Sequence, residues 1–243
     1  MRILILGGTS EAAALARALD GRPDLSVVTS LAGRTRDPLP LPGEVRVGGF
    51  GGAPGLEAFL REEAIARVID ATHPFAARIS ANAARACQAA GVPRLRLLRP
   101  PWPAGPVDRW HEVADAAAAA RLLPRLGRCA FLTLGHGDLE AFAGLDGVRL
   151  VARTIEPPPD PPPIEARWIH ARGPFRLGDE VALLEHHGID VLVTKASGGE
   201  ATYAKLAAAR ALGLPVIMIR RPPPPPGPVV TSVAAALAWL DGG

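Results

Sequence analysis

The first residues able to do chemistry are two glycines, Gly7 and Gly8, between a short apolar run and a helical pattern. A strand that enters a helix through such a turn presents backbone N–H groups at the positive end of the helix dipole, where phosphate binds. The pattern predicts a dinucleotide site at these glycines and the following Thr9 and Ser10. The G-x-G-x-x-G fingerprint is incomplete, because Thr9 and Ala12 occupy two of its glycine positions. A plain glycine turn with Ser10 as the helix N-cap is the alternative explanation.

Polar residues also follow the second predicted strand, at 25–30, where a dinucleotide fold holds the adenosine ribose. An NAD site places a carboxylate there, whereas an NADP site needs a cation and hydroxyl groups for the 2′-phosphate. Ser30, Gly33 and Arg34 occupy this position, and no acidic residue occurs before Asp37. We therefore expect NADP(H) as the cofactor, although an ordinary polar loop would have a similar composition.

Two further segments at predicted strand ends complete the expected nucleotide site. Gly48 and Gly49 belong to a segment with four glycines in five residues, which lets the backbone approach a ligand closely. A mobile loop would have the same composition. Thr72 follows the fourth predicted strand, at 67–70, and we expect it to contact the cofactor as well.

His73 comes next in the chain, followed by Pro74 and Phe75. Pro74 suits the first position of a helix, which would put His73 at or beside the N-cap. His73 would then lie at the carboxyl end of a buried strand, where open α/β sheets bind ligands. We expect His73 and Phe75 to contact the substrate, and His73 is a candidate catalytic residue; a capping histidine is the alternative. No second ligand stands at a recognisable spacing, so no metal site is predicted.

A second glycine pair follows another predicted buried strand, at 190–194, and precedes another predicted helix. The only two lysines of the chain fall beside it, although arginine serves elsewhere, which indicates a need for compact ammonium groups. These groups, a hydroxyl and the glycine amides would converge on one anion, unless the lysines are simply solvated beside a glycine turn. Lys195 is the second candidate for a catalytic role. The residues expected to bind an anionic substrate here and at a neighbouring strand end are Arg172, Lys195, Ser197, Gly198, Gly199 and Lys205.

The order of the predicted elements places all of these residues at strand ends. Strands alternate with helices in both halves of the chain, which predicts an α/β fold of two Rossmann-like, doubly wound domains with mainly parallel sheets. Residues 99–106 contain four prolines and are typical of a linker. We therefore expect an NADP-binding domain at 1–99 and a substrate-binding domain at 107–243, with the active site in a cleft between the carboxyl edges of the two sheets.

Composition narrows the class of partner. With 243 residues, 48% of them hydrophobic, the chain can bury a large core. The formal net charge of +3, without basic runs or many aromatic residues, favours small anionic ligands over nucleic acid. Cys87 and Cys129 form no Cys-x-x-Cys motif, and no apolar run is long enough to span a membrane. We therefore expect a cytoplasmic protein with reduced thiols, no metal, no membrane partner and no nucleic-acid partner.

Six motifs spread over nearly the whole chain resemble those of the precorrin-6A reductase family of cobalamin biosynthesis. They are ILGGTSE at 5–11, SLAGRT at 30–35, DATHPFA at 70–76, RGPF at 172–175, TKASGG at 194–199 and KLAAAR at 205–210. The third and fifth motifs are the specific ones. Ala196 is a departure, since a polar residue such as asparagine or aspartate is expected there, and this puts in doubt a side-chain role at that position.

The resemblance implies that the chain transfers a hydride from NADPH to one double bond of precorrin-6A, giving precorrin-6B. The many acetate and propionate carboxylates of this tetrapyrrole would account for a cleft rich in arginine and lysine. Other enzymes of the pathway are possible partners for substrate transfer. Two alternatives stay open: a cobalt-precorrin-6A reductase, and a non-catalytic NADP-sensing protein.

Overall fold

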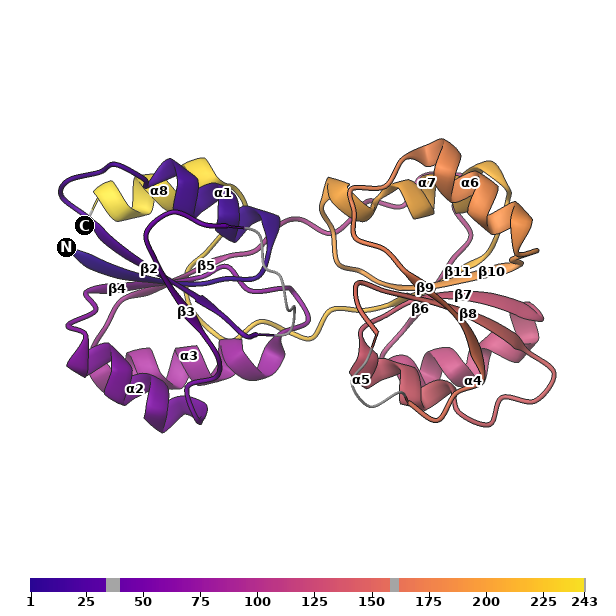
Figure 1. The fold of residues 1–243 in the computed structure, drawn as a ribbon, viewed down its shortest axis with the longest axis horizontal. Coiled ribbons are helices and arrows are strands. Elements are labelled where there is room, and N and C mark those ends of the chain that lie inside the picture. The colour runs from indigo at the N-terminus through magenta and orange to yellow at the C-terminus, as the bar shows by residue number, and fades with distance from the viewer. Residues whose placement is uncertain (34–39, 158–161, 243) are drawn as a thin grey trace. The chain divides into compact units, whose positions relative to one another are not determined.

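The computed structural model describes residues 1–33, 40–157 and 162–242, and it separates into two compact units (Figure 1). Unit 1 comprises Met1–Pro100 and Pro222–Gly243, and unit 2 comprises Pro101–Arg221. Each unit contains one six-stranded sheet with helices on both faces. The α/β fold with two doubly wound, parallel sheets predicted from the sequence is confirmed.

Unit 1 has the strand order β12-β5-β4-β1-β2-β3, and every pair in it is parallel. The order reverses between β1 and β4, which makes their carboxyl ends the topological switch point. The strands are β1 (Arg2–Leu6), β2 (Ser26–Leu31), β3 (Glu44–Val47), β4 (Arg67–Asp70), β5 (Arg94–Leu97) and β12 (Val229–Val230). The helices are α1 (Ser10–Ala18), α2 (Gly52–Glu62), α3 (Ala77–Ala90) and α8 (Val233–Asp241).

The sequence dictates this arrangement through burial on both faces of the central strands. Ile3 and Ile5 of β1 face α1 and α8, whereas Leu4 and Leu6 face α2 and α3, and all four are at most 2% exposed. Because alternate side chains of a strand point to opposite faces, a continuous apolar run needs a helical layer on each side. The first strand is therefore fixed at the centre of the sheet.

The predicted boundary of the second domain was wrong at its C-terminal end. The sequence interpretation assigned all of 107–243 to that domain, but the chain returns to unit 1 at Pro222. There Val229 and Val230 pair with β5, and Ala236 and Leu240 of α8 pack in the same core as α1. A two-residue edge strand after a run of prolines has no periodicity by which the sequence could reveal it.

Unit 2 has the strand order β6-β11-β10-β7-β8-β9, again parallel throughout, with its switch point between β7 and β10. The strands are β6 (Trp110–Val113), β7 (Cys129–Thr133), β8 (Arg149–Thr154), β9 (Ala166–His170), β10 (Val191–Lys195) and β11 (Val216–Ile219). The helices are α4 (Ala116–Leu126), α5 (His136–Leu139), α6 (Leu177–His186) and α7 (Ala204–Ala211), with short 3₁₀ turns η1 (Glu140–Phe142) and η2 (Glu200–Thr202).

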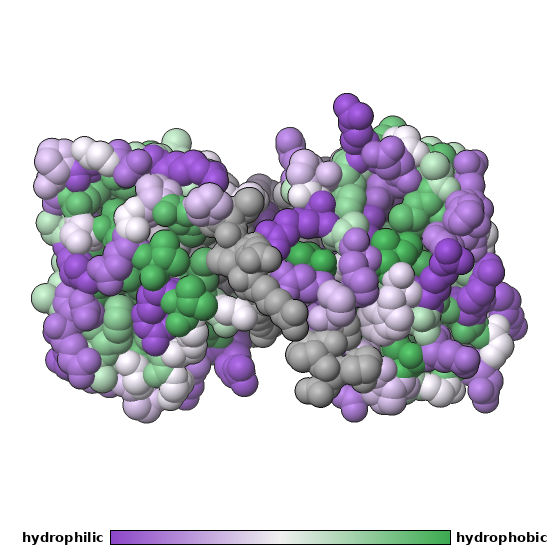
Figure 2. Space-filling model, viewed as in Figure 1, coloured by the Kyte–Doolittle hydropathy of each residue, from purple (hydrophilic) through white to green (hydrophobic). Residues whose placement is uncertain are grey.

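Polar and apolar residues are interspersed over the visible face of each unit (Figure 2). Within the described part of the chain, no helix has both the length and the apolar character needed to cross a membrane. Cys87 and Cys129 are free and buried. Burial raises the pKa of the Cys87 thiol to about 11.

Candidate functional site

The glycine turn after β1 favours glycine at both positions, for different reasons. The N–H of Gly7 donates to the carbonyl of Ser30 at 2.8 Å, and a Cβ on Gly7 would lie 3.2 Å from the Thr29 side chain. Gly8 has φ of 102°, a conformation that side chains disfavour, and a Cβ there would meet nothing within 4 Å. The space next to the Gly8 Cα is therefore open to a ligand at the start of α1.

Thr9, and not Ser10, is the N-cap of α1, so the alternative that made Ser10 the cap is wrong. The Thr9 hydroxyl accepts a hydrogen bond from the N–H of Ala12 at 3.1 Å and donates one to the carbonyl of Ala71 at 2.7 Å. It thereby ties the helix to the end of β4 across the switch point. Ser10 is exposed, and its hydroxyl lies 3.2 Å from a carboxylate oxygen of Glu11.

Glu11 is the acidic residue of the first turn of α1. Its carboxylate forms an ion pair with Arg99 at 3.0 Å, and both side chains are mostly buried. The positive charge of Arg99 therefore offsets the one acidic group that would repel phosphate at this helix N-terminus.

Ser30 lies at the end of β2 and is 6% exposed. Gly33 follows with φ of 69°, and a Cβ on it would lie 3.3 Å from a methyl group of Val47 in β3. Arg34, the cation expected to bind the 2′-phosphate, lies outside the described residues.

The glycine loop after β3 is held by Arg46. Its guanidinium donates to the carbonyls of Gly48 at 2.7 Å and Gly49 at 2.8 Å, and it stacks over the ring of Phe50 at 4.0 Å. Gly48 has φ of 115°. Three contacts from one side chain thus fix the loop at the same sheet edge as the glycine turn.

Asp70, which was not among the site residues predicted from the sequence, ends β4 and is completely buried. One carboxylate oxygen accepts the hydroxyl of Thr72 at 2.7 Å and its N–H at 3.2 Å. The other lies 3.3 Å from Arg96 and 3.9 Å from Arg94 of β5. Ser80 of α3 lies 3.2 Å from the Thr72 hydroxyl. Thr72 is 7% exposed, and its hydroxyl serves this internal network.

His73 begins a β-turn and not the helix, so the expected place of Pro74 was wrong. The N–H of Ala76 donates to the carbonyl of His73 at 2.8 Å, with Pro74 at the second position of the turn, and α3 begins only at Ala77. The N–H of Phe75 donates to Nδ1 of His73 at 3.3 Å. Neutral His73 therefore carries its proton on Nε2.

In unit 2, Lys195 at the end of β10 forms an ion pair with Asp138 of α5, which follows β7. This pair crosses the switch point of the second sheet. The lysine side chain is 18% exposed and that of Asp138 is 31% exposed. Asp138 could not be selected from the sequence, since only the adjacency of β7 and β10 brings it to Lys195.

The sequence predicts a helix after the second glycine pair, but the pair does not lead directly into an α-helix. Gly198 has φ of 68° and Gly199 has φ of 81° with ψ of 155°, which only glycine adopts readily. The 3₁₀ turn η2 follows, and α7 begins at Ala204. Ser197 N–H donates to the carbonyl of Lys195 at 2.6 Å. The segment 195–199, called the anion loop below, is therefore shaped by its own glycines.

Lys205 and Arg172 have different environments. Lys205 is 5% exposed, and its Nζ lies 5.5 Å from the ring centroid of Trp102, so the structure makes it an internal cation of unit 2. Arg172 is exposed, and its guanidinium lies 3.7 Å from Glu156.

The segment after Arg172 packs on a buried ion pair. Arg153 and Glu180 form a bidentate pair below it, and the Arg153 guanidinium stacks 3.7 Å from the ring of Phe175. Arg153 is 7% exposed, so it supports the 172–175 segment from inside.

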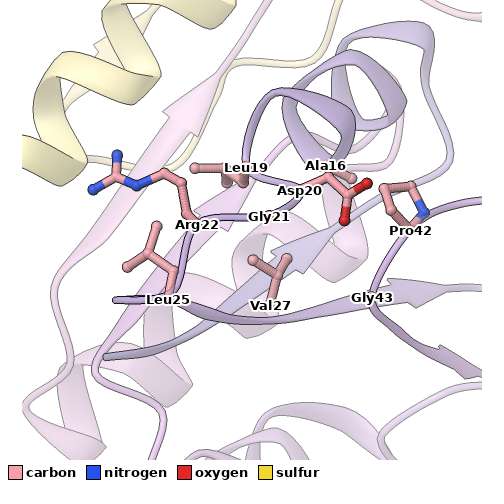
Figure 3. Close-up of a pocket in the computed structure, with 9 residues that line it drawn as sticks. All are labelled: Ala16, Leu19, Asp20, Gly21, Arg22, Leu25, Val27, Pro42 and Gly43. Carbon is pink, nitrogen blue, oxygen red and sulfur yellow. The ribbon is translucent and has the colours of Figure 1, made fainter.

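A small pocket in unit 1 lies away from this site. The pocket in Figure 3 has a volume of about 90 Å³ and lies at the amino ends of β2 and β3, between residues that include Leu19, Val27 and Gly43. It is smaller than the pockets that hold drug-sized ligands, which exceed roughly 300 Å³. Among the residues that the structure describes, no group of three or more His, Cys, Asp or Glu side chains could hold a metal ion.

Comparison with known proteins gives one consistent family. The family model described as "Precorrin-6x reductase CbiJ/CobK" matches residues 2–241. The precorrin-6A reductase of Rhodococcus erythropolis is 53% identical over 240 residues, covering 98% of this chain and 97% of that protein. The cobalt-precorrin-6A reductase of Salmonella typhimurium is 34% identical, covering 94% and 89%. A solved structure described as "CobK precorrin-6A reductase" superimposes with a TM-score of 0.93 at 42% identity, covering 100% and 96%.

Proposed function

Because the chain belongs to the precorrin-6x reductase CbiJ/CobK family, we propose that it reduces one double bond of precorrin-6A to give precorrin-6B, with NADPH as the hydride donor. The observation that carries this proposal is that the family match runs through both units, so it includes both glycine turns and the His73 turn. The reaction adds a hydride to one carbon of the double bond and a proton to the other. It makes the chain an oxidoreductase and leaves the NADP-sensing alternative without support.

The residues of unit 1 fit a dinucleotide. The open space above Gly8, the N–H groups at the start of α1 and the neutralised Glu11 together favour a pyrophosphate at the switch point. Ser30 at the end of β2, followed by Arg34, supports binding of the 2′-phosphate of NADP(H) in preference to NAD(H). When bound, the cofactor supplies the hydride.

The protein's own residues orient the reactants. Gly7 and Gly8 let the backbone approach the nucleotide, with Gly33, Gly48 and Gly49 forming the neighbouring edge. Thr9 acts by holding α1 to β4, and Thr72 by holding the turn at His73. These contacts set the geometry of the site before any ligand binds, which is the main contribution of a protein to cofactor chemistry.

His73 presents Nε2–H, because its Nδ1 already accepts the Phe75 N–H. We assign it to positioning the macrocycle by donating a hydrogen bond, with the apolar ring of Phe75, 5.9 Å away, as a second contact.

The anion loop supplies the complement to the substrate carboxylates. Lys195 provides a positive charge, while Ser197, Gly198 and Gly199 provide a hydroxyl and backbone donors. Arg172, which follows the edge strand β9 of the same sheet, adds an exposed guanidinium. Lys205 is assigned to the interior of unit 2, where it supports the loop and does not contact the substrate.

The deciding experiment is incubation of the purified protein with precorrin-6A and NADPH, followed by absorbance at the NADPH band and mass spectrometry of the product. We expect one NADPH oxidised per product, and a product two hydrogen atoms heavier than the substrate. No NADPH oxidation, in an assay where a known reductase turns over, would reject the proposal.

Cobalt-precorrin-6A is the second candidate substrate, because a reductase of that name is also a relative. The relative named for the metal-free substrate is the more similar of the two reported above. We therefore expect higher kcat/KM for the metal-free compound in a direct comparison. Two buried free thiols support a reducing, cytoplasmic location, where other enzymes of the pathway could supply and remove the tetrapyrroles.

A further inference from the structure

The chain enters unit 2 at Pro101 and leaves it at Arg221, and residues at both crossings bind the anion loop. Trp102 donates its indole N–H to the carbonyl of Gly199 at 2.8 Å. Arg221 donates Nε to the carbonyl of Ala196 at 2.6 Å and Nη2 to that of Ser197 at 2.9 Å. Three carbonyls of one short loop are thus occupied by the two connections between the units.

These bonds fix the direction of the loop's N–H groups. In a planar trans peptide the C=O and the following N–H point to opposite sides. With the carbonyls of Ser197 and Gly199 turned to Arg221 and Trp102, the N–H groups of Gly198 and Glu200 point away from them. The two glycines, with φ of 68° and 81°, make this orientation sterically accessible. Backbone N–H groups of a loop that are left facing outward can bind an anion.

Trp102 is itself held firmly. Its ring packs against Tyr203, with the ring centroids 6.4 Å apart, and against Lys205. Tyr203 accepts from Arg210 at 3.0 Å, and Arg210 makes a two-bond contact with Asp108, at 2.8 Å for each bond. The first connection is therefore attached to the turn that follows the anion loop.

The second connection is held at its other end as well. Arg221 opens the run of five prolines, a segment that resists bending. In unit 1, Arg94 donates to the carbonyl of Pro226 at 2.7 Å, and the same arginine lies 3.9 Å from Asp70. Asp70 holds Thr72, the residue before His73. The far end of the proline run is therefore held within unit 1.

We propose that Trp102 and Arg221 are positioning residues for the substrate. Their hydrogen bonds to the carbonyls of the anion loop orient the N–H groups of the loop toward a tetrapyrrole carboxylate. The proposal rests on the proposed function of the loop. It explains why each of the two connections between the units carries a side chain that donates a hydrogen bond to the same loop. Such bonds are not needed merely to connect the units.

The test uses the full-length protein and steady-state kinetics with precorrin-6A and NADPH. Trp102→Phe keeps an aromatic ring and removes only the indole donor, so we expect KM for precorrin-6A to rise about fivefold, the factor for one hydrogen bond. Glutamine is shorter and has a single amide nitrogen, so Arg221→Gln cannot keep both bonds, and we expect a rise of about 5- to 25-fold. KM for NADPH should stay within about twofold, because the nucleotide site is in unit 1.

Matched controls separate positioning from general weakening. Trp239→Phe removes an indole N–H from α8 in unit 1, and Arg109→Gln removes a bond from an arginine to the Gly213 carbonyl at 2.9 Å in unit 2. We expect both controls to keep the wild-type KM for both substrates. Melting temperatures measured on all four variants identify any that are simply unfolded.

Two outcomes would overturn the inference. One is an unchanged KM for precorrin-6A in both Trp102→Phe and Arg221→Gln while the wild-type protein is active. The other is an equal rise in both KM values, which would mean a general loss of structure. Inactive wild-type protein would instead reject the proposed function, so the two failures are distinguishable. If Arg221→Gln does not fold, the Trp102→Phe result alone decides.

Discussion

In unit 1, the segments that follow β1 and β4, the strands on the two sides of the switch point, are joined by a neutral hydrogen bond from the hydroxyl of Thr9 to the carbonyl of Ala71. In unit 2, the equivalent strands are joined by an ion pair between Asp138 and Lys195. Both sheets are parallel and reverse their order at this point. The same topology therefore presents two different surfaces: backbone N–H groups in unit 1, and backbone N–H groups together with the charged Lys195 side chain in unit 2.

This difference allows one fold to serve two ligands. A pyrophosphate is compact and accepts several backbone N–H bonds at a helix N-terminus, so glycines suit it. Tetrapyrrole carboxylates are spread around a large ring on flexible arms, so a charge on a side chain suits them. Altering the glycine turn should therefore weaken nucleotide binding, and removing the lysine charge should weaken substrate binding.

The largest expected effect comes from Gly8→Val. The residue has φ of 102°, so a β-branched side chain is strained there and also fills the space assigned to the nucleotide. We expect KM for NADPH to rise about 100-fold, from roughly 2–3 kcal/mol of strain and lost contact. KM for precorrin-6A should not change.

The control for this variant is Gly144→Val in unit 2. Gly144 also has a positive φ, of 67°, and open space around it. It should lose similar stability without losing affinity for NADPH. If both variants weaken NADPH equally, the glycine turn of unit 1 is not the nucleotide site.

Next in size is Lys195→Met. It removes the cation and leaves Asp138 facing the substrate carboxylates, so we expect KM for precorrin-6A to rise about 30-fold. KM for NADPH should stay the same. Lys195→Arg retains the charge and should recover part of the loss, and Lys195→Met kinetics identical to wild type would remove the lysine from the site.

A third substitution tests how much the Thr9 hydroxyl contributes to the stability of the fold. Thr9→Val removes both the N-cap bond and the bond across the switch point, and we expect a cost of about 1–2 kcal/mol in the free energy of unfolding. Thr9→Ser keeps a hydroxyl and should cost much less. Urea unfolding of both variants measures the difference, and equal stability of the two would show that neither bond of the Thr9 hydroxyl contributes.

The smallest expected effect concerns charge in unit 2. Hydrogen bonds from Arg210 hold the pKa of Asp108 below its ordinary value, so this ion pair stabilises the fold at neutral pH and is lost as pH falls through that low pKa. Asp108→Asn should cost about 1 kcal/mol at neutral pH, since Arg210 is one-third exposed.

The pH dependence checks the sign of this effect. Urea unfolding of wild type and Asp108→Asn should give free energies that converge as the pH falls from about 7 to about 3. A difference that grows on acidification would contradict it.

Much of the fold could be predicted because the apolar strands are buried on both faces and end in glycine or polar residues. Residues 3–6 and 190–194 show this pattern, and both lie at the centre of a sheet. The short strands β6 and β12 were not predicted. They lie at sheet edges, where their side chains need no apolar pattern.

Site residues could be proposed from the sequence where they lie next to a glycine turn in the chain, as Lys195 does. Partners that come from other elements could not be found this way. Asp138 reaches Lys195 only because β7 lies beside β10, and Trp102 reaches Gly199 from almost 100 positions away. Pro74 was misplaced because a proline suits the second position of a β-turn as well as the start of a helix.

The most direct test of the central contrast is equilibrium binding without turnover: NADP⁺ and precorrin-6A, each titrated separately into wild type, Gly8→Val and Lys195→Met. The account predicts that Gly8→Val loses affinity for NADP⁺ alone and Lys195→Met for the tetrapyrrole alone. Loss of the same ligand by both variants, or of both ligands by either folded variant, would contradict it.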